Sequence, residues 1–138
     1  MDTKFSVAVH VLILVSESPH PMTSDQMGES VGTNASYIRK ILALLKKAGI
    51  VDGHRGISGY SLLIAPDQLT LLRIYRAVME EEQTHILDIH QNPSDLCMVG
   101  RHIRPVLTEL FAQVEDSFAR SLASQTLADC MDAIRKRM

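Results

Sequence analysis

The sequence predicts a mainly helical fold with one small β-hairpin and one long helix near the C-terminus. Three observations carry this prediction. Two helical patterns between residues 24 and 49 are joined by a tight, glycine-containing turn. The stretch HRGISGYSL, residues 54–62, then places two glycines between short apolar runs, which is typical of a hairpin. Over residues 98–122, apolar side chains recur every three or four positions, as on one face of a helix.

The composition is that of a globular protein. The 138 residues suffice for one hydrophobic core, and 46% of them are hydrophobic and 22% charged. The apolar stretch VAVHVLILV is too short to span a bilayer and lacks signal-peptide flanks, so we expect a cytoplasmic protein with no membrane partner. Cys97 and Cys130 are the only cysteines, so no disulfide framework is expected.

The chain begins with two predicted helices. Residues 3–16 form a helix that is apolar on most sides and therefore central. The two prolines of ESPHPM end it. Thr23 or Ser24 then caps a short helix over residues 24–31, whose acidic side chains lie where the helix dipole favours them.

A tight turn leads into the third predicted helix. Gly32 is the expected C-cap of the preceding helix, and Asn34 or Ser36 is the expected N-cap of a helix over residues 36–49. The apolar residues of this helix share one broad face: Ile38, Ile41, Leu42, Leu44 and Leu45. Two helices of modest length joined in this way form the helix-turn-helix pattern.

The hairpin follows directly. Residues 50–53 and 60–65 are short β-type runs, and Gly56 and Gly59 lie in the bend between them. Helix, turn, helix and hairpin in this order are the elements of a winged helix. The sequence therefore predicts a winged helix-turn-helix domain over residues 1–80.

Residues 81–138 are predicted to form a second part. Thr70 caps a helix over residues 71–82, a polar loop follows at 90–96, and Ser124 or Thr126 caps a last helix. The long helix between them carries an apolar stripe that is typical of a dimer seam, although packing against its own domain would give the same pattern. The stripe consists of Ile103, Leu107, Leu110, Val114, Phe118 and Leu122.

Charge is distributed unevenly along the chain. Residues 36–65 contain five cations and one anion, a net charge of +4, whereas residues 66–138 contain eight cations and eleven anions, a net charge of −3. A local positive field on an otherwise acidic chain is suited to contact with phosphates through one face. A solvated helix face would give the same charge count.

The stretch SYIRKILALLKKAGIVDGHRGISGYSLLIAPDQLTLLRIYRAV resembles the Rrf2 family of bacterial winged-helix transcription regulators, which includes IscR and CymR. The patterns that carry the resemblance are R-G-x-x-G-Y-x-L and P-x-x-L-T-L-x-x-I-x-R-A-V, together with LASQTLADCM near the end. The likeness covers nearly the whole chain in the family's order. The wing has fewer glycines than the family often shows, so its tip is expected to be shorter and stiffer.

The resemblance implies a homodimer that binds a partly palindromic operator in double-stranded DNA. The winged helix would contact DNA, and the long helix over residues 98–122 would supply the dimer interface. Repression is the expected direction of regulation, because occluding a promoter requires only binding. An effector protein or small molecule is an open alternative for the signal.

Physical reasoning selects candidate DNA contacts. The major groove admits one α-helix, and a helix N-terminus offers backbone N–H groups to phosphates. We interpret Arg39 as the residue that hydrogen-bonds to guanine and Arg55 as a contact in the minor groove. Lys46 and Lys47 either contact DNA or lie on a helix face that contacts only solvent. The full set comprises Asn34, Ser36, Tyr37, Arg39 and Lys40 on the helix, and His54, Arg55, Gly56 and Gly59 on the wing.

The cysteines argue against a family-type iron–sulfur cluster. Cluster-binding members of the family carry three cysteines in the loop before the long helix, and this chain has only Cys97 there, so no cofactor is expected. Cys97 is either a structural cysteine or a thiol switch activated by Arg101 and His102. A metal site is not expected, because the spacing of the candidate ligands matches no compact motif. These ligands are His85, His90, Cys97 and His102, with Asp88 or Asp95.

An enzyme is not expected either. The sequence contains no G-x-x-x-x-G-K-[ST] phosphate loop, no G-x-S-x-G nucleophile elbow and no H-E-x-x-H metal motif. The competing class is a winged helix that binds a protein partner instead of DNA. The cluster of cations over residues 36–65 counts against this alternative.

Overall fold

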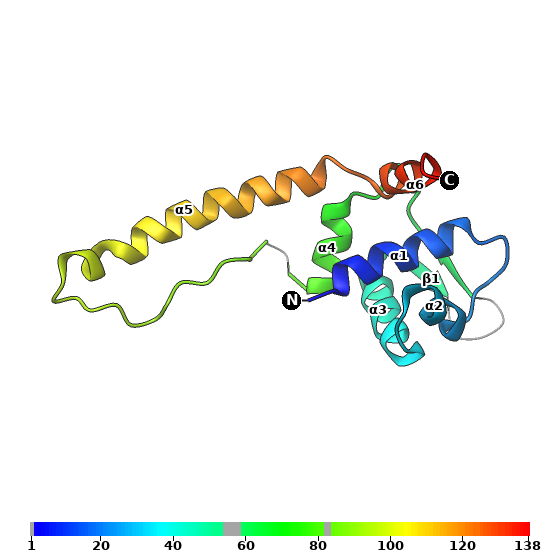
Figure 1. The fold of residues 1–138 in the computed structure, drawn as a ribbon, viewed down its shortest axis with the longest axis horizontal. Helices are drawn as coiled ribbons and strands as arrows, with labels where there is room; N and C mark the ends of the chain where they lie inside the picture. The colour runs from blue at the N-terminus through cyan, green and yellow to red at the C-terminus, as the bar shows by residue number, and fades with distance from the viewer. Residues whose placement is uncertain (1, 54–58, 82–83) are drawn as a thin grey trace.

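The structure is a computed structural model, and it describes residues 2–53, 59–81 and 84–138. Within these ranges it confirms the predicted fold class, with six helices and one two-stranded antiparallel sheet. The elements are α1 (Lys4–Glu17), α2 (Ser24–Val31), α3 (Ala35–Lys47), β1 (Val51–Gly53), β2 (Tyr60–Leu62), α4 (Leu71–Met79), α5 (Met98–Ala123) and α6 (Leu127–Arg135). Figure 1 shows a body, made of α1 to α4, the sheet and α6, and an arm, residues 84–123, that projects from it.

Helix α1 is central, as predicted. Its buried side chains are Ala8, Val11 and Leu12. It contacts α2, α3, α4, α6 and β2. An apolar helix with few charges can make contacts on several sides, and this explains why α1 organises the body around it.

The helix-turn-helix is closed by side-chain caps. Thr23 and Gln26 form a capping box: Thr23 Oγ1 accepts a hydrogen bond from Gln26 N at 3.1 Å, and Gln26 Oε1 accepts one from Thr23 N at 2.9 Å. Gly32 ends α2 in the left-handed conformation, with φ 86°. Asn34 Oδ1 accepts from Tyr37 N at 2.8 Å and starts α3. In both helices the first of the two predicted cap residues is the one used.

The two strands are shorter than the predicted β-type runs. β1 and β2 pair antiparallel, with Val51 opposite Leu62 and Gly53 opposite Tyr60. One further backbone bond, from Leu63 N to Ile50 O at 2.9 Å, extends the ladder. Helix α3 ends at Lys47, three residues before Ile50, so the described part of the chain has no further strand residues that could pair with the second strand after Leu63. The wing residues 54–58 lie outside the described ranges.

Helix α4 ends earlier than the predicted residue 82. Its C-cap is Glu80, which has a φ of 56° and therefore lies in the left-handed region. The backbone N–H groups of Glu80 and Glu81 both return to the carbonyl of Arg76, which completes the last turn.

Helix α6 belongs to the core of the body. Leu127 is fully buried and Met131 is nearly so, in the cluster that also contains Leu12 and Ile41. Backbone hydrogen bonds fasten the approach to α6: Leu71 N donates to Gln125 O, and Leu127 N donates to Leu69 O, both at 2.9 Å. The division at residues 80 and 81 stays a prediction, but the end of the second part packs with the first.

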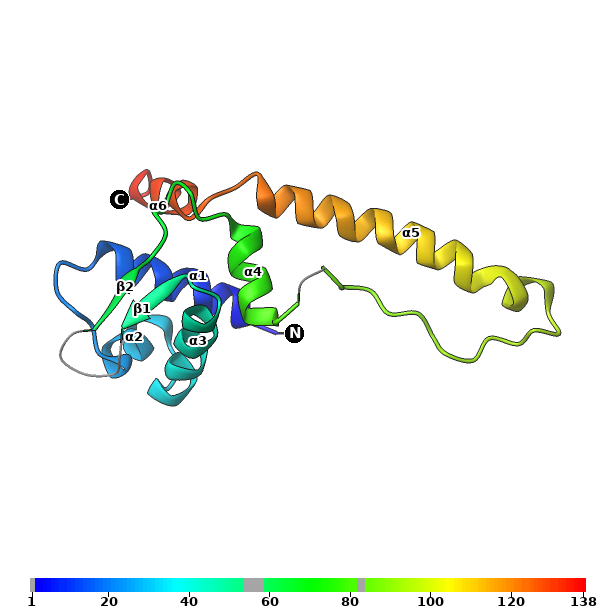
Figure 2. The same cartoon turned by 180° about the vertical axis from the view of Figure 1, so that it is seen from behind.

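Most of the arm is separate from this core, and only its end, at Leu122, packs against it. None of the 26 residues of α5 is fully buried, and its main contacts with other elements are to α4. Figure 2 shows α5 leaving the body, with the chain that precedes it running beside it. Arg104 Nη2 holds that chain by donating to His90 O at 3.0 Å. Among the described helices, none has the length and apolar character needed to cross a membrane.

Candidate nucleic-acid interface

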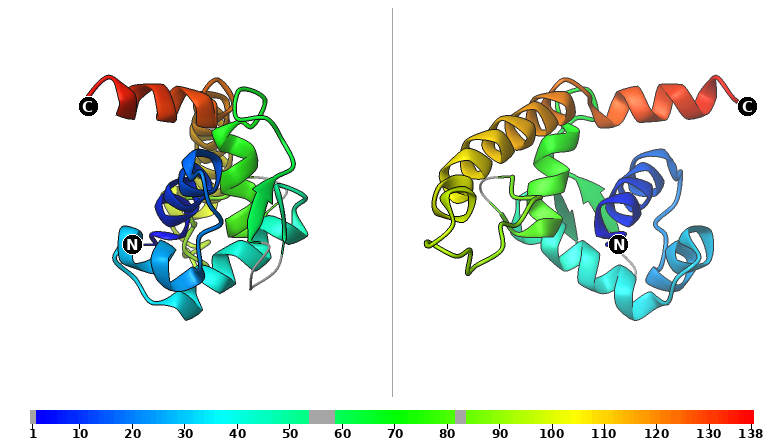
Figure 3. Two further views of the ribbon diagram at one scale, coloured as in Figure 1. Left: turned by 90° about the vertical axis from the view of Figure 1, so that its right-hand side faces the viewer. Right: turned by 60° about the vertical axis from the view of Figure 1, so that its left-hand side comes forward.

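Helix α3 buries one face and presents the other. Its buried side chains are Ile38, Ile41, Leu42 and Leu45. The exposed residues Ser36, Lys40, Ala43 and Lys47 follow at spacings of four, three and four, which places them on one outer face. Figure 3 shows α3 at the side of the body opposite α6. The outer face of α3 is therefore open to a large partner.

The predicted DNA contacts at the start of α3 differ in the solvent exposure of their side chains and in whether these side chains already have partners. Ser36 and Lys40 are exposed, whereas Arg39 is half-buried. Asn34 is exposed, but its side-chain oxygen is engaged by the N-cap bond. Tyr37 packs against the larger core cluster. The structure thus brings these residues together at one end of α3, with Ser36 and Lys40 the most accessible.

Lys46 and Lys47 have partners in the body. Lys46 Nζ donates to the carbonyl oxygen of Gly53 at 3.0 Å, which ties α3 to the first strand of the wing. Lys47 Nζ lies 3.8 Å from Glu80 Oε1, and both side chains are largely exposed. An exposed pair of this kind contributes about 0–1 kcal/mol to stability. These contacts were missed by sequence reasoning, because the partners lie seven and thirty-three positions away.

The base of the wing is shaped by Gly59. This residue is buried and has a φ of 63°, and a Cβ placed on it would lie 2.6 Å from Pro21 Cβ. Both the left-handed backbone and the close approach require glycine. Of the other predicted wing residues, His54, Arg55 and Gly56 lie outside the described ranges.

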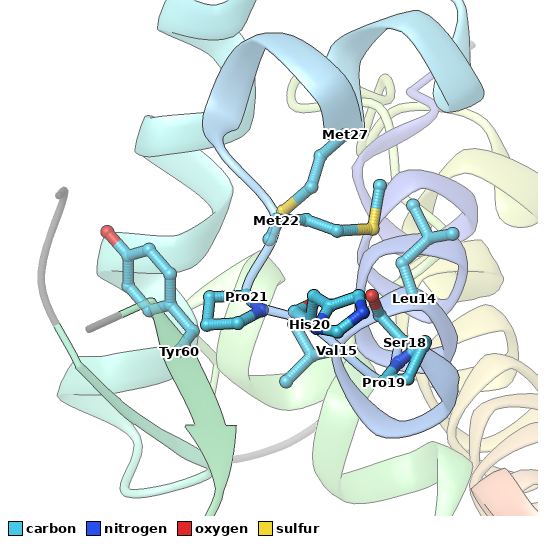
Figure 4. A pocket seen from close by; sticks show the side chains of 9 residues that line it. All are labelled: Leu14, Val15, Ser18, Pro19, His20, Pro21, Met22, Met27 and Tyr60. Carbon is cyan, nitrogen blue, oxygen red and sulfur yellow. The ribbon is translucent and has the colours of Figure 1, made fainter. Parts of the chain in front are cut away.

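A cavity lies behind the helix-turn-helix at this point. Its volume is about 200 Å³, and Figure 4 shows that the loop between α1 and α2, the end of α1 and Tyr60 of β2 enclose it. Met22 and Met27 supply much of its apolar wall. The loop between α1 and α2 therefore lies between α2 and β2, with residues of all three segments around the cavity.

The two cysteines are in different surroundings. Cys97 is exposed at the start of α5, where the nearby backbone N–H groups of Gly100 and Val99 lower the pKa of its thiol. Burial raises the pKa of the half-buried Cys130 thiol. The cause at Cys97 is therefore the helix start, not the cationic side chains proposed from the sequence. One of these, Arg101, donates from Nε to Asp95 O at 3.0 Å.

The candidate metal ligands are not gathered. In the parts of the chain that the structure describes, no group of three or more His, Cys, Asp or Glu side chains is placed to hold a metal ion. His85 instead lies 2.7 Å from Asp88 through Nε2 and Oδ1, and this hydrogen bond raises the pKa of the imidazole.

Comparisons with known proteins agree with the fold and show the family. The family model Rrf2, described as an iron-dependent transcriptional regulator, matches residues 1–133. YwnA of Bacillus subtilis (strain 168), named as an HTH-type transcriptional regulator, is 36% identical over 132 residues, covering 96% of this chain and 97% of YwnA. A crystal structure named as that of a DNA binding protein has a TM-score of 0.73 and 35% identity, covering 93% of this chain and 98% of its own. CymR of B. subtilis, at 21% identity and 96% coverage of both chains, shares the fold with a TM-score of 0.70. The chain therefore belongs to the Rrf2 family of DNA-binding transcription regulators and is not an enzyme.

Proposed function

We propose that this chain represses transcription as a homodimer that binds a partly palindromic operator. The observation that carries the proposal is the position of α3, whose apolar face is in the core while its polar and cationic face stands clear at the edge of the body. A helix presented in this way matches the width of the major groove.

Each predicted contact has a separate task in this arrangement. Ser36 and Lys40 approach phosphates or base edges from the exposed start of α3. Arg39 reads guanine through paired hydrogen bonds, and Asn34 and Tyr37 hold the start of the helix in place. In the wing, Arg55 and His54 reach the minor groove, and Gly56 and Gly59 provide the turn that carries them.

The dimer interface is proposed on only part of the predicted stripe. Phe118 lies against Tyr75 of α4, with ring centroids 5.3 Å apart, and Leu122 packs against the core of the body. Leu110 and Val114 remain 50% and 47% exposed. The C-terminal end of the stripe therefore packs α5 against the body of its own chain, while the middle of the stripe is exposed and can contact a second copy.

An exposed apolar strip on α5 extends this free surface. We define the arm strip as Val99, Val106, Leu110 and Val114, which follow at spacings of seven, four and four and are 68%, 58%, 50% and 47% exposed. Ile103 and Leu107 flank it and are half-buried. An apolar strip of this kind on one helix face is well suited to pair with its copy in a second chain.

The donor set does not match the iron in the family's description. Cys97 lies at the start of α5 and Cys130 in α6, which is on the body, so the loop before α5 supplies a single thiolate. Thiolates hold iron–sulfur clusters, generally four per cluster. We therefore propose regulation without a family-type cluster. Purification without air, followed by an absorption spectrum and iron analysis, should give a colourless, iron-free protein that still binds DNA.

A second candidate for the signal is favoured by the exposure of Cys97 and its lowered pKa. A thiolate at this position attacks a low-molecular-weight disulfide, forms a mixed disulfide and releases the other half as a thiolate. Treatment with oxidised glutathione should then change operator affinity in the wild type and leave a Cys97→Ser variant unchanged.

DNA binding is tested by titrating the full-length protein with the DNA upstream of its own gene, against a shuffled sequence of equal length. Arg39→Ala should weaken specific binding by about 1–3 kcal/mol and relax the preference at particular base pairs. Arg55→Ala should weaken binding to all sequences and lower the salt dependence by about one counterion. Arg137→Ala, two residues after the end of α6 on the opposite side of the body, is the matched control.

Two results would contradict the proposal. One is wild-type affinity and preference in Arg39→Ala. The other is binding that does not depend on sequence or salt, which would support a winged helix that recognises a protein partner instead.

A further inference from the structure

A second cavity lies where the arm joins the body. It has a volume of about 270 Å³ and is formed by α4, the first residues of the arm and α5. Its lining residues are Arg76, Thr84, Ala112, Glu115, Asp116 and Ala119. The four from α5 follow at spacings of three, one and three, so they form one face of that helix. Two alanines leave the space between the polar side chains open.

Two polar atoms beside this cavity lack partners. Arg76 Nε and Thr84 Oγ1 are buried, and neither has a hydrogen bond to any residue that the structure describes. Nearly all buried polar groups in folded proteins are hydrogen-bonded, so an unpaired pair at one site indicates a missing partner. Arginine offers donors only, and a hydroxyl also donates, so the partner must supply acceptor atoms.

Two of the residues that line the cavity are acidic. Glu115 Oε2 accepts hydrogen bonds from the backbone N–H groups of Leu87, at 2.9 Å, and Ile86. These bonds lower the pKa of the carboxyl group, which keeps it charged at neutral pH. Asp116 stands at the rim, with Oδ2 3.3 Å from Arg120 Nε and its side chain 66% exposed. His85 Nδ1 also lies 3.8 Å from Glu115 Oε2, so a positive group already lies beside this carboxylate, and a further one is favoured near the exposed Asp116.

We propose that the cavity binds a small zwitterion of the α-amino acid class. Its carboxylate accepts hydrogen bonds from Arg76 and Thr84, and its ammonium group lies toward Glu115 and Asp116. A simple anion would meet two carboxylates, and a simple cation would leave Arg76 unpaired. The cavity is slightly smaller than the range of about 300–1,000 Å³ that is typical of drug-sized ligands, which favours a small metabolite over a nucleotide.

The position of Arg76 gives this site a route to the DNA-binding elements. Arg76 also lines a neighbouring cavity together with Leu44, Lys47 and Ala48 at the end of α3. A ligand that engages the guanidinium therefore acts on a side chain shared with the helix proposed to enter DNA. Control of operator binding by the ligand depends on the proposed function, whereas binding of the ligand itself does not.

Ligand binding is tested by calorimetric titration of the full-length protein without DNA, so its failure is distinct from a failure of DNA binding. Each of the common α-amino acids is the probe, up to about 10 mM, and each one that binds is compared with its amine and its deaminated acid. At least one amino acid should bind, and both analogues should bind at least about tenfold more weakly. Absence of binding by every probe, or equal binding of the acid or the amine alone, would overturn the proposal.

Variants locate the bound molecule in this cavity. Arg76→Gln and Thr84→Val should each weaken binding about tenfold, because each removes one donor to the carboxylate. The matched controls are Arg73→Gln, on the exposed side of α4, and Thr108→Val, on α5, and neither should change the affinity. Thr84→Val nearly preserves side-chain volume, so it keeps the test decisive if Arg76→Gln unfolds. Wild-type affinity in both cavity variants would place the ligand elsewhere and refute the site.

Discussion

The body and the arm use their apolar residues in different ways. In the body, α1, α3, α4 and α6 all contribute buried side chains to one core. The arm contains the longest described helix, α5, which has no fully buried residue and carries several half-exposed valines and leucines. The fold of the body is therefore determined within one chain, whereas the arm leaves apolar side chains exposed, and these are the basis of the dimer proposed above. Four predictions test this contrast.

The largest expected effect is in the core. Leu12→Ala removes a fully buried side chain and should lower the free energy of unfolding by about 2–5 kcal/mol in a urea titration. Val106→Ala, on the arm strip, should change it by less than about 0.5 kcal/mol at a dilution that yields monomers. Equal losses from the two substitutions would show that α5 packs within its own chain.

The second expected effect is on assembly. Leu110→Lys places a charge in the proposed interface and should weaken dimerisation by about 2 kcal/mol, roughly thirtyfold, in sedimentation equilibrium. Leu63→Lys is the matched control, because Leu63 is 57% exposed on the body and Leu110 is 50% exposed on the arm. A Leu110→Lys protein that remains dimeric would exclude the arm strip as the interface.

The cysteines give a smaller, chemical measure of the same contrast. A lower pKa gives Cys97 a larger thiolate fraction at neutral pH, whereas Cys130 has a raised pKa and is half-buried. Cys97 should therefore react with iodoacetamide at least about tenfold faster, and its rate should level off at a lower pH than that of an ordinary thiol. Mass spectrometry of the two peptides measures both rates. Similar rates would mean that Cys97 is protected in solution.

The smallest effect is expected at the root of the arm. The pKa of Glu115 is lowered by bonds from Leu87 and Ile86, so the stability they give is present above the ordinary carboxyl pKa and is lost as the pH falls through the lowered value. The protection of these two amides against hydrogen exchange, measured relative to the intrinsic exchange rate at each pH, should be high at neutral pH and should fall in acid. Glu115→Ala should remove the protection at every pH, whereas Asp116→Ala should leave it intact.

Much of the body could be predicted because local interactions determine it. Thr70 caps α4, as expected, and Thr126, one of the two expected candidates, caps α6. Their hydroxyl groups accept hydrogen bonds from the backbone N–H groups of Arg73 and Asp129, both at 3.2 Å. Such caps require only residues three positions apart, and a sequence displays them directly. The apolar face of α3 could likewise be predicted from the helical spacing of its apolar residues.

The arm could be predicted only in part. The spacing of the stripe indicated a helix face, but the point at which that face leaves the body depends on where α4 ends and how Tyr75 meets Phe118. The unpaired atoms of Arg76 and Thr84 also arise from three segments meeting in space. The early end of α4 had no signal, because Glu80 adopts a backbone conformation that glutamate rarely uses.

The backbone bonds that fasten Gln125 and Leu127 to Leu71 and Leu69 limit how two molecules can associate. Because the arm leaves the body after α4 and re-enters it at α6, it is a loop closed at both ends. An arm of this kind cannot be exchanged with a neighbour unless α6 first leaves the core. The proposed dimer through α5 would therefore form without domain swapping, and mixed dimers should appear as fast as dimers dissociate, with no unfolding step.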